Sequence, residues 1–162
     1  MGRAPRLAGF DYVAPYGYFL TICTFERRPW FADDGAARSA TRHLLRTSRD
    51  YGFEAIAYCF MPDHLHALVA GVREDSSFPR FAAMFKQRSA FDHLSCRTGR
   101  LWQEGYFERV LLAEDDLQGI AAYILANPVR AGLCDRFGEY SHLGSPRYSV
   151  EQLRYAVQIR PE

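Results

Sequence analysis

The sequence predicts a single α+β domain with a split βαβ fold of the ferredoxin-like type. Its segments follow the order β-α-β-β-α-β, which is typical of that fold, and one more helical segment comes after them. The chain has 162 residues, 48% of them hydrophobic, and no repeat or linker, so residues 1–162 are expected to form one domain. Its core would span about residues 15–135, followed by a loop-rich tail at 136–162. In this fold an antiparallel sheet carries both long helices on one face, so the added helix is expected to cover the other.

The first half of the chain contains three predicted strands and one helix. Residues 18–25 are β-branched and aromatic and predict the first strand. Residues 34–50 predict a helix, with Asp33 or Asp34 as its N-cap. Residues 53–61 and 64–71 predict a β-hairpin around the Pro62-Asp63 turn, and the second of these strands would be central in the sheet.

The second half adds the second long helix, the fourth strand and the extra helix. Residues 78–96 predict a helix because their apolar residues recur at i, i+3, i+4 and i+7. Residues 106–113 predict a strand, and residues 115–127 a helix that ends at Pro128, since the residue before proline is pushed out of the helical region. A short helix is expected near residues 149–157.

The third predicted strand carries two histidines, His64 and His66, with one leucine between them. In a strand the side chains at i and i+2 point to the same face, so the two imidazoles are expected side by side. This spacing suits two nitrogen ligands of a metal ion. The alternative from spacing alone is a pair of ordinary hydrogen-bonded histidines on a strand.

The extra helix offers a candidate third ligand and a nucleophile. Its expected buried stripe has helical spacing and consists of Leu117, Ile120, Ala121 and Ile124. Tyr123 and Asn127 fall together on the flank of that stripe as i, i+4 neighbours. The alternative reading makes Tyr123 a boundary aromatic residue and Asn127 a helix C-cap before proline.

Two histidines and one amide oxygen would leave open positions on a divalent cation such as Mg²⁺ or Mn²⁺. Phosphate oxygens or water can fill these positions, and the metal would then polarise a phosphodiester for attack by the tyrosine. The products would be a covalent phosphotyrosine and a free 3′-hydroxyl. The covalent bond stores the energy for rejoining, so ATP is not needed.

The stretch "MPDHLHALV" resembles the histidine–hydrophobic–histidine motif of the HUH single-strand DNA transferases. Four further stretches resemble blocks of the REP-associated tyrosine transposases, and the resemblance runs from about residue 10 to residue 145: "ERRPWF", "FKQRSA", "LWQEGYFERV" and "YILANPVRAGL". It implies His64 and His66 as metal ligands and Tyr123 as the nucleophile. Asn127 would be the third ligand, at a place where related transposases often have glutamine.

The resemblance also implies a substrate. Family members nick and rejoin single-stranded DNA beside a short hairpin through a 5′-phosphotyrosine, and in this branch the hairpins are repetitive extragenic palindromes. Related insertion-sequence enzymes are dimers that exchange the tyrosine helix, whereas this branch includes monomers. Both a monomer and a homodimer therefore remain open.

Several basic residues are candidates for DNA contact. Lys86 and Arg88 match a basic site of the family, and Arg130 follows the tyrosine helix. Arg27 and Arg28 stand beside aromatic residues, a mixture that suits unpaired bases and phosphates. A stripe along the first helix is expected to be either a solvated face or a set of phosphate contacts, and consists of Arg38, Arg42, Arg46 and Arg49.

The sequence also limits the alternatives. Four widely spaced cysteines do not form a zinc-finger framework, and no run approaches the roughly 18 apolar residues of a membrane span. Without a signal-like start we expect a cytoplasmic protein, associated with the nucleoid when bound to DNA. Two other functions remain: a module that binds hairpin DNA or RNA without cutting it, and a metal-dependent hydrolase of a small phosphate ester in which Tyr123 only orients the substrate.

Overall fold

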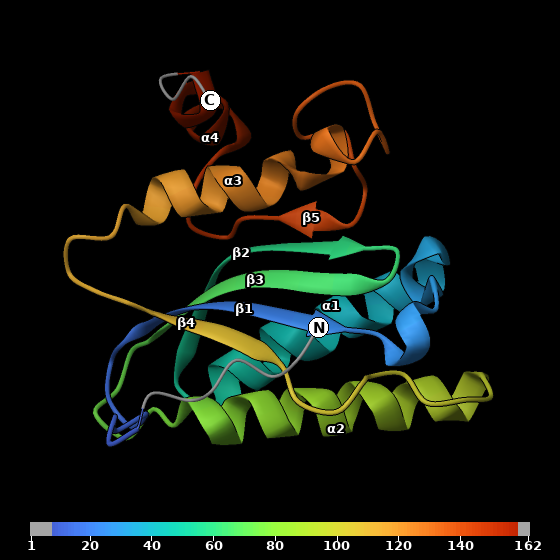
Figure 1. Ribbon diagram of the computed structural model, residues 1–162, viewed down its shortest axis with the longest axis horizontal. Coiled ribbons are helices and arrows are strands. Elements are labelled where there is room, and N and C mark those ends of the chain that lie inside the picture. The colour runs from blue at the N-terminus through green and yellow to red at the C-terminus, as the bar shows by residue number, and fades with distance from the viewer. Residues whose placement is uncertain (1–7, 159–162) are drawn as a thin grey trace.

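The computed structural model describes residues 8–158 and confirms the predicted α+β fold. A five-stranded sheet, in the order β4-β1-β3-β2-β5, separates two layers of helices (Figure 1). Helices α1 and α2 cover one face, whereas α3 and α4 lie on the other side of the sheet. All paired strands are antiparallel.

The first four strands form the predicted split βαβ sheet. They are β1 (Gly17–Cys23), β2 (Phe53–Met61), β3 (His64–Gly71) and β4 (Phe107–Leu111). Strand β3 pairs with β1 on one side and with β2 on the other, so its predicted central position is confirmed. The fifth strand, β5 (Leu143–Gly144), was not predicted; two residues carry no periodic signal, and they pair with the outer edge of β2.

Helices α1 (Asp34–Asp50) and α2 (Phe78–Cys96) have the predicted bounds. The Asp33 side chain caps α1 by accepting a hydrogen bond of 2.7 Å from the backbone N–H of Ala36. Two short 3₁₀ turns, Phe25–Arg27 and Trp30–Ala32, connect β1 to α1. The core between these helices and the sheet is mainly aromatic and aliphatic, and its largest buried side chains include Tyr18, Phe31, Phe60, Phe78, Phe81 and Phe85.

Helix α3 spans Leu117–Arg130, so the prediction that it ends before Pro128 was wrong. A proline inside a helix removes the hydrogen bond to the carbonyl four residues earlier, which here is that of Ile124. The Asn127 side chain replaces the missing donor, because its Nδ2 donates to the Ile124 carbonyl at 3.2 Å. The helix therefore continues for two residues past the proline. Its start is fixed by Asp116, whose side chain accepts from the backbone N–H of Gly119 at 3.0 Å.

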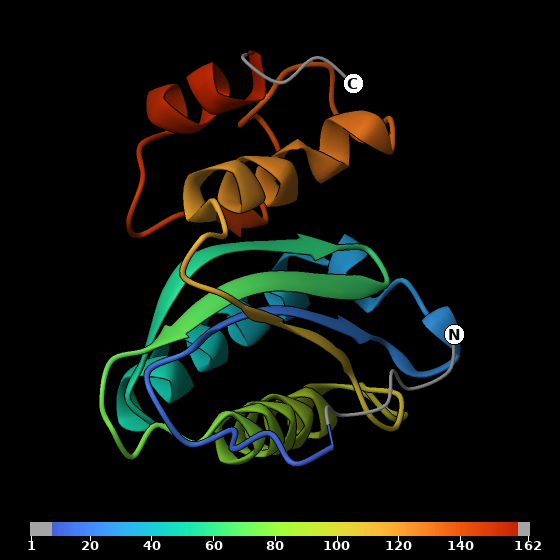
Figure 2. The same cartoon turned by 60° about the vertical axis from the view of Figure 1, so that its left-hand side comes forward.

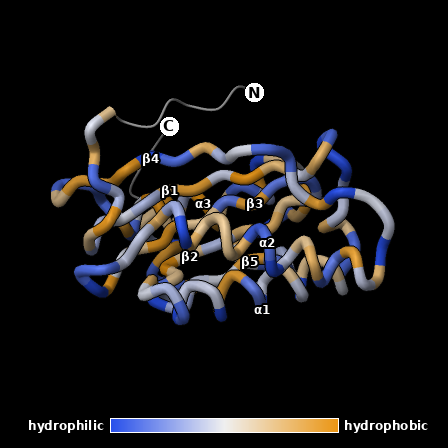
Figure 3. Tube along the Cα trace, turned by 90° about the horizontal axis from the view of Figure 1, so that it is seen from below, coloured by the Kyte–Doolittle hydropathy of each residue, from blue (hydrophilic) through white to orange (hydrophobic). Residues whose placement is uncertain are grey.

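A second core lies between α3 and the sheet face that α1 and α2 do not cover. It contains Ile56, Ala57 and Cys59 of β2, Leu68 of β3, and Ala121, Ile124 and Leu125 of α3. Of the predicted stripe, Ala121 and Ile124 are buried, whereas Leu117 and Ile120 are half-buried. Helix α4 (Val150–Gln158) packs against α3 (Figure 2). Hydrophobic residues recur along the strands and alternate with hydrophilic ones along the helices (Figure 3).

The tail is tied to the outer edge of β2 at several points. Tyr140 donates to the Phe60 carbonyl at 3.1 Å, and Ser145 donates to the Ile56 carbonyl at 2.6 Å. Arg147 forms a bidentate ion pair with Glu54. These contacts fix the chain between α3 and α4 against the sheet. No helix among residues 8–158 is long and apolar enough to cross a membrane.

Candidate active site

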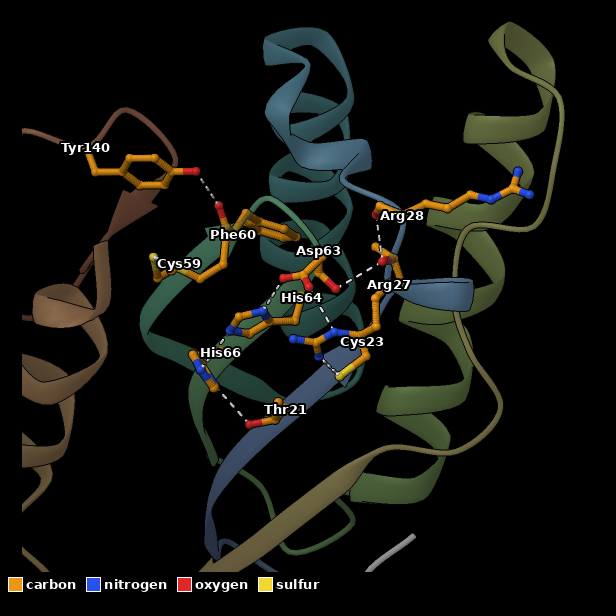
Figure 4. A network of polar contacts seen from close by, with 12 residues as sticks. Thr21, Cys23, Arg27, Arg28, Cys59, Phe60, Asp63, His64, His66 and Tyr140 are labelled. Carbon is orange, nitrogen blue, oxygen red and sulfur yellow. Dashed lines mark hydrogen bonds and ion pairs between the residues drawn. The ribbon is translucent and has the colours of Figure 1, made fainter. Parts of the chain in front are cut away.

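Strand β3 places the two histidines on the face of the sheet that α3 covers. Alternation along β3 directs Leu65 and Ala67 into the core beneath α1 and α2, so His64 and His66 point the other way. Both histidines are half-buried. The prediction that they share one face is therefore confirmed, and they lie side by side (Figure 4).

The imidazoles face each other through the same ring atom. His64 Nε2 lies 3.1 Å from His66 Nε2. On the far sides of the rings, His64 Nδ1 lies 2.7 Å from the Asp63 carboxylate and His66 Nδ1 lies 2.9 Å from the Thr21 hydroxyl (Figure 4). Because a carboxylate only accepts hydrogen bonds, the contact with Asp63 places a proton on His64 Nδ1, and Nε2 is the ring atom directed at His66.

This arrangement fits a metal ion. Two ligands at about 2.1 Å from an octahedral cation stand about 3 Å apart when they occupy neighbouring corners, which is close to the separation of the two Nε2 atoms. A carboxylate behind a metal-binding histidine is the usual way to fix the ring. Burial, with the charges of His64, Arg130 and Arg27 as smaller causes, lowers the pKa of His66 to about 4, so this ring is neutral at pH 7.

The metal would need further ligands of a different kind. Among residues 8–158 no group of three or more histidine, cysteine, aspartate or glutamate side chains is close enough to hold a metal. The histidine pair would be completed by amide, water or phosphate oxygens, all of which suit Mg²⁺ or Mn²⁺. The role of Asn127 as a third ligand stays a prediction.

Arg27 extends the network beyond Asp63. Its Nε lies 2.8 Å from the second carboxylate oxygen of Asp63, and one of its terminal nitrogens donates to Cys23 Sγ at 2.7 Å (Figure 4). Glu26 and Arg27 have φ angles of 55° and 56°, in the left-handed region that non-glycine residues seldom adopt. This turn brings Arg27 back to the end of β1, where Asp63 lies between the guanidinium and His64.

Helix α3 carries Tyr123 and Asn127 on the same side of the sheet as the histidine pair. The Tyr123 side chain is 54% exposed, and its hydroxyl makes no hydrogen bond with any described residue. Asn127 turns its amide nitrogen toward the carbonyls of Tyr123 and Ile124. Its oxygen makes no hydrogen bond within the described chain. The structure therefore brings Tyr123 and Asn127 to the face of the pair, but it shows no direct contact between them and the histidines.

Arg130 connects the end of α3 to both parts of the site. Its guanidinium lies over the Tyr123 ring, 4.0 Å from the ring centre, and donates to the Tyr123 carbonyl at 2.8 Å. Its positive charge also contributes to the low pKa of His66. Among the predicted basic residues, Arg130 is therefore the one that contacts Tyr123.

The two predicted basic residues of α2, Lys86 and Arg88, form contacts within the protein. Lys86 donates to the carbonyls of Gln103 and Gly105 at 2.8 and 2.7 Å, and burial lowers the pKa of its ammonium to about 8. Arg88 forms a 2.6 Å ion pair with Asp50. Both residues lie in the helical layer opposite the histidines, so a role in DNA contact stays a prediction that these bonds do not support.

The remaining predicted basic residues, Arg28 and the stripe of four along α1, are all exposed. Arg28 is exposed and pairs with Glu26 at 3.1 Å. In the stripe along α1, Arg38 pairs with Asp34 and Arg46 lies 4.0 Å from Asp50. Both interpretations of this stripe stay predictions, and α1 covers the sheet face that does not bear the histidines.

The sequence analysis does not identify Thr21, and it places Asp63 only in a turn. Thr21 lies on β1 and faces His66 only because the two residues are directly opposite each other in the antiparallel register. That register follows from the fold and is not visible in either strand alone. Asp63 directly precedes His64, and that adjacency was the only available signal for its contact with the ring.

In sequence, the chain is similar to two proteins named as REP-associated tyrosine transposases. A Haemophilus influenzae protein named as a REP-associated tyrosine transposase is 29% identical over 128 residues, which cover 71% of each chain. The REP-associated tyrosine transposase of Escherichia coli is 30% identical over 93 residues, which cover 56% of this chain and 54% of that one.

Two solved structures share the fold. One is a REP-associated tyrosine transposase bound to a REP hairpin, with a TM-score of 0.72 and 20% identity over 88% of this chain and 82% of that chain. The other, a transposase from Deinococcus radiodurans, has a TM-score of 0.52 and 22% identity over 80% of this chain and 92% of that one. At these identities the likeness concerns the fold alone.

A split βαβ sheet with paired histidines on its central strand and a tyrosine-bearing helix on the same face defines a protein of the transposase class. Within that class, the model of the family described as "Transposase IS200 like" matches residues 13–127. The chain belongs to this family.

Proposed function

We propose that the protein is a metal-dependent single-stranded DNA transesterase that nicks and rejoins hairpin-forming palindromic DNA through a covalent 5′-phosphotyrosine. The observation that carries this proposal is the pair of Nε2 atoms 3.1 Å apart, each on a ring whose other nitrogen is held by Asp63 or Thr21. Such a pair is built to bind a cation rather than to fill a core.

The residues divide the chemistry among them. His64 and His66 would hold Mg²⁺ or Mn²⁺, with Asn127 as a candidate third ligand, and the bound ion would polarise the phosphodiester and favour the phenolate. The Tyr123 oxygen bonds to phosphorus while the bond from phosphorus to the 3′ oxygen breaks. The phenol proton goes to solvent, and the leaving 3′ oxygen takes up a proton. Rejoining is the reverse reaction, in which a 3′-hydroxyl displaces Tyr123.

The exposure of Tyr123 supports this role. A nucleophile that attacks a phosphodiester within a polymer must be reachable by the strand, and the Tyr123 side chain is on the surface. Arg130 lies over the Tyr123 ring, so a phosphate that binds beside this tyrosine would be close to a positive charge. The proposed substrate is hairpin DNA, because a solved structure with the same fold is bound to a REP hairpin and the curated relatives are named after such repeats.

The test is formation of a covalent protein–DNA adduct. We would mix the protein with single-stranded hairpin oligonucleotides from palindromes near its own gene, labelled at the 5′ or the 3′ end, in Mg²⁺, Mn²⁺ or EDTA. Denaturing gels should show an adduct that needs metal and retains the 3′ label, since the 5′ phosphate of that fragment would be joined to the tyrosine. Substitution of either histidine, His64→Ala or His66→Ala, should abolish it.

A matched pair of tyrosine variants gives the control. Tyr123→Phe should form no adduct, whereas Tyr155→Phe, which changes a 66% exposed tyrosine on α4, should react normally. Full adduct formation by Tyr123→Phe would refute the proposal. Hairpin binding with no adduct under any metal would instead favour a binding module, and release of inorganic phosphate or a nucleotide without an adduct would favour a hydrolase.

A further inference from the structure

Helix α3 covers only half of the sheet face that carries the histidines. It packs on β2 and, to a smaller extent, on β3. Strands β1 and β4 continue the sheet on the other side of β3, away from α3 (Figures 1 and 2). On this uncovered half, β4 presents Phe107, whose side chain is 44% exposed.

Phe107 lies in line with the metal site. In the antiparallel registers Phe107 is directly opposite Thr21, and Thr21 is directly opposite His66. Residues directly opposite one another project from the same face, so the three side chains form one row across the sheet. With strands about 4.8 Å apart, Phe107 begins about 10 Å from His66, a distance that a few nucleotides span.

A second aromatic ring fills the space beside this row. Phe19, two residues before Thr21 on β1, is half-buried and stacks on the His66 imidazole with ring centres 5.6 Å apart and planes at 20°. Arg109 of β4 is directly opposite Phe19 and is exposed. The exposed Arg109 guanidinium pairs with Asp115.

We propose that Phe19 and Phe107 form a stacking platform for the unpaired bases that flank the scissile phosphate. The proposal rests on the proposed function and assigns it a base-binding surface. Unpaired bases stack on aromatic side chains whatever their sequence, and flanking arginines hold the backbone. The platform is continuous with the histidine pair through the Phe19–His66 stack, and two arginines, Arg27 and Arg109, each paired with an aspartate, lie at its margins.

The position of Phe107 separates it from other exposed aromatic residues. Phe91 on α2 is 80% exposed but lies in the helical layer on the opposite side of the sheet from the histidines. Double-stranded DNA keeps its bases stacked inside the helix and offers none to such a surface. The platform therefore predicts recognition of a single strand next to the hairpin and no contribution to the hairpin stem itself.

The experiment compares a blunt hairpin with the same hairpin carrying single-stranded extensions on both sides. Affinities are measured by fluorescence anisotropy in the Tyr123→Phe background, which cannot form an adduct, and 2-aminopurine in the extensions reports stacking. Phe107→Ala should weaken binding of the extended DNA by roughly tenfold and reduce 2-aminopurine quenching. Binding of the blunt hairpin should not change. Phe107→Trp should restore both signals, and Phe91→Ala should alter neither.

Failure of the platform and failure of the chemistry give different results. If Phe107→Ala binds the extended DNA as tightly as the parent while the wild type forms the tyrosine adduct, the platform is wrong and the transesterase stands. If Phe107→Ala loses the extension-dependent affinity while no adduct ever forms, the platform stands as part of a binding module. A loss that is equal for blunt and extended hairpins, and that Phe107→Trp does not reverse, would overturn the platform, because the effect of Phe107 would then not depend on flanking bases.

Discussion

At the scale of single residues, the site is a chain of polar contacts that ends at the two Nε2 atoms. Arg27 holds one oxygen of Asp63, and the other oxygen holds His64. Thr21 performs the corresponding role for His66 from the neighbouring strand. Each ring is therefore fixed from behind, which lowers the entropy lost when a metal binds.

Asp63 should accordingly act as a positioning residue for the metal. Asp63→Ala is expected to weaken Mn²⁺ binding by about 10- to 100-fold, the usual effect of losing a carboxylate behind a metal-bound histidine. Isothermal titration calorimetry measures the affinity. Asp75→Ala, which removes an exposed carboxylate paired with Arg73, is the control. Unchanged Mn²⁺ affinity in Asp63→Ala would show that the contact with His64 is incidental.

The residues of the site differ in how far the sequence predicts them. The spacing of His64 and His66 along one strand indicates their shared face, and the i, i+4 spacing of Tyr123 and Asn127 indicates their shared flank. Thr21 cannot be found this way because its partner is 45 positions away in the chain and is chosen by strand register. For Lys86 the structure adds what the sequence does not show, since its ammonium donates to two backbone carbonyls.

At the scale of elements, α3 depends on side chains at both of its ends. Asp116 accepts from the Gly119 N–H at the start, and Asn127 supplies the donor that Pro128 lacks near the end. The rule that proline ends a helix failed here because it considers the backbone alone. The bounds of α1, α2, β2 and β3 were predicted correctly, since their periodic patterns run between clear caps and turns.

The cap at Asp116 should contribute measurably to stability. Asp116→Ala is expected to lower the free energy of unfolding by about 1 kcal/mol, because the Gly119 N–H loses its acceptor. Urea denaturation followed by circular dichroism gives this value. Asp116→Asn keeps an oxygen acceptor and should stay close to the wild type. Equal losses in both variants would mean that the charge, and not the cap, supports the helix.

At the scale of the whole molecule, the tail joins the tyrosine helix to the sheet of its own chain. Strand β5 pairs with β2, Arg147 pairs with Glu54, and Gln118 of α3 donates to the backbone of Gln152 in α4 at 3.1 Å. Exchange of α3 between two copies would have to break these contacts or carry the tail along. Of the two oligomeric states that the sequence leaves open, these contacts favour the monomer.

We therefore expect a monomer of about 18.6 kDa in light scattering and a site completed within one chain. Mixing provides a sharper check. Equimolar His64→Ala and Tyr123→Phe should form no more adduct than either variant alone, because neither chain contains both parts of the site. Recovery of adduct in the mixture would mean that two chains exchange the tyrosine helix.

The central position of β3 has a consequence for motion. Backbone amides of a strand that is paired on both sides exchange with solvent only when much of the protein unfolds, whereas an outer helix can open locally. In a hydrogen–deuterium exchange experiment, the amides of residues 64–69 should therefore exchange most slowly and those of α3 sooner. Similar exchange rates in both segments would argue against such partial opening. The histidine pair would then stay assembled while Tyr123 moves, which gives a long strand of DNA room to enter and leave between them.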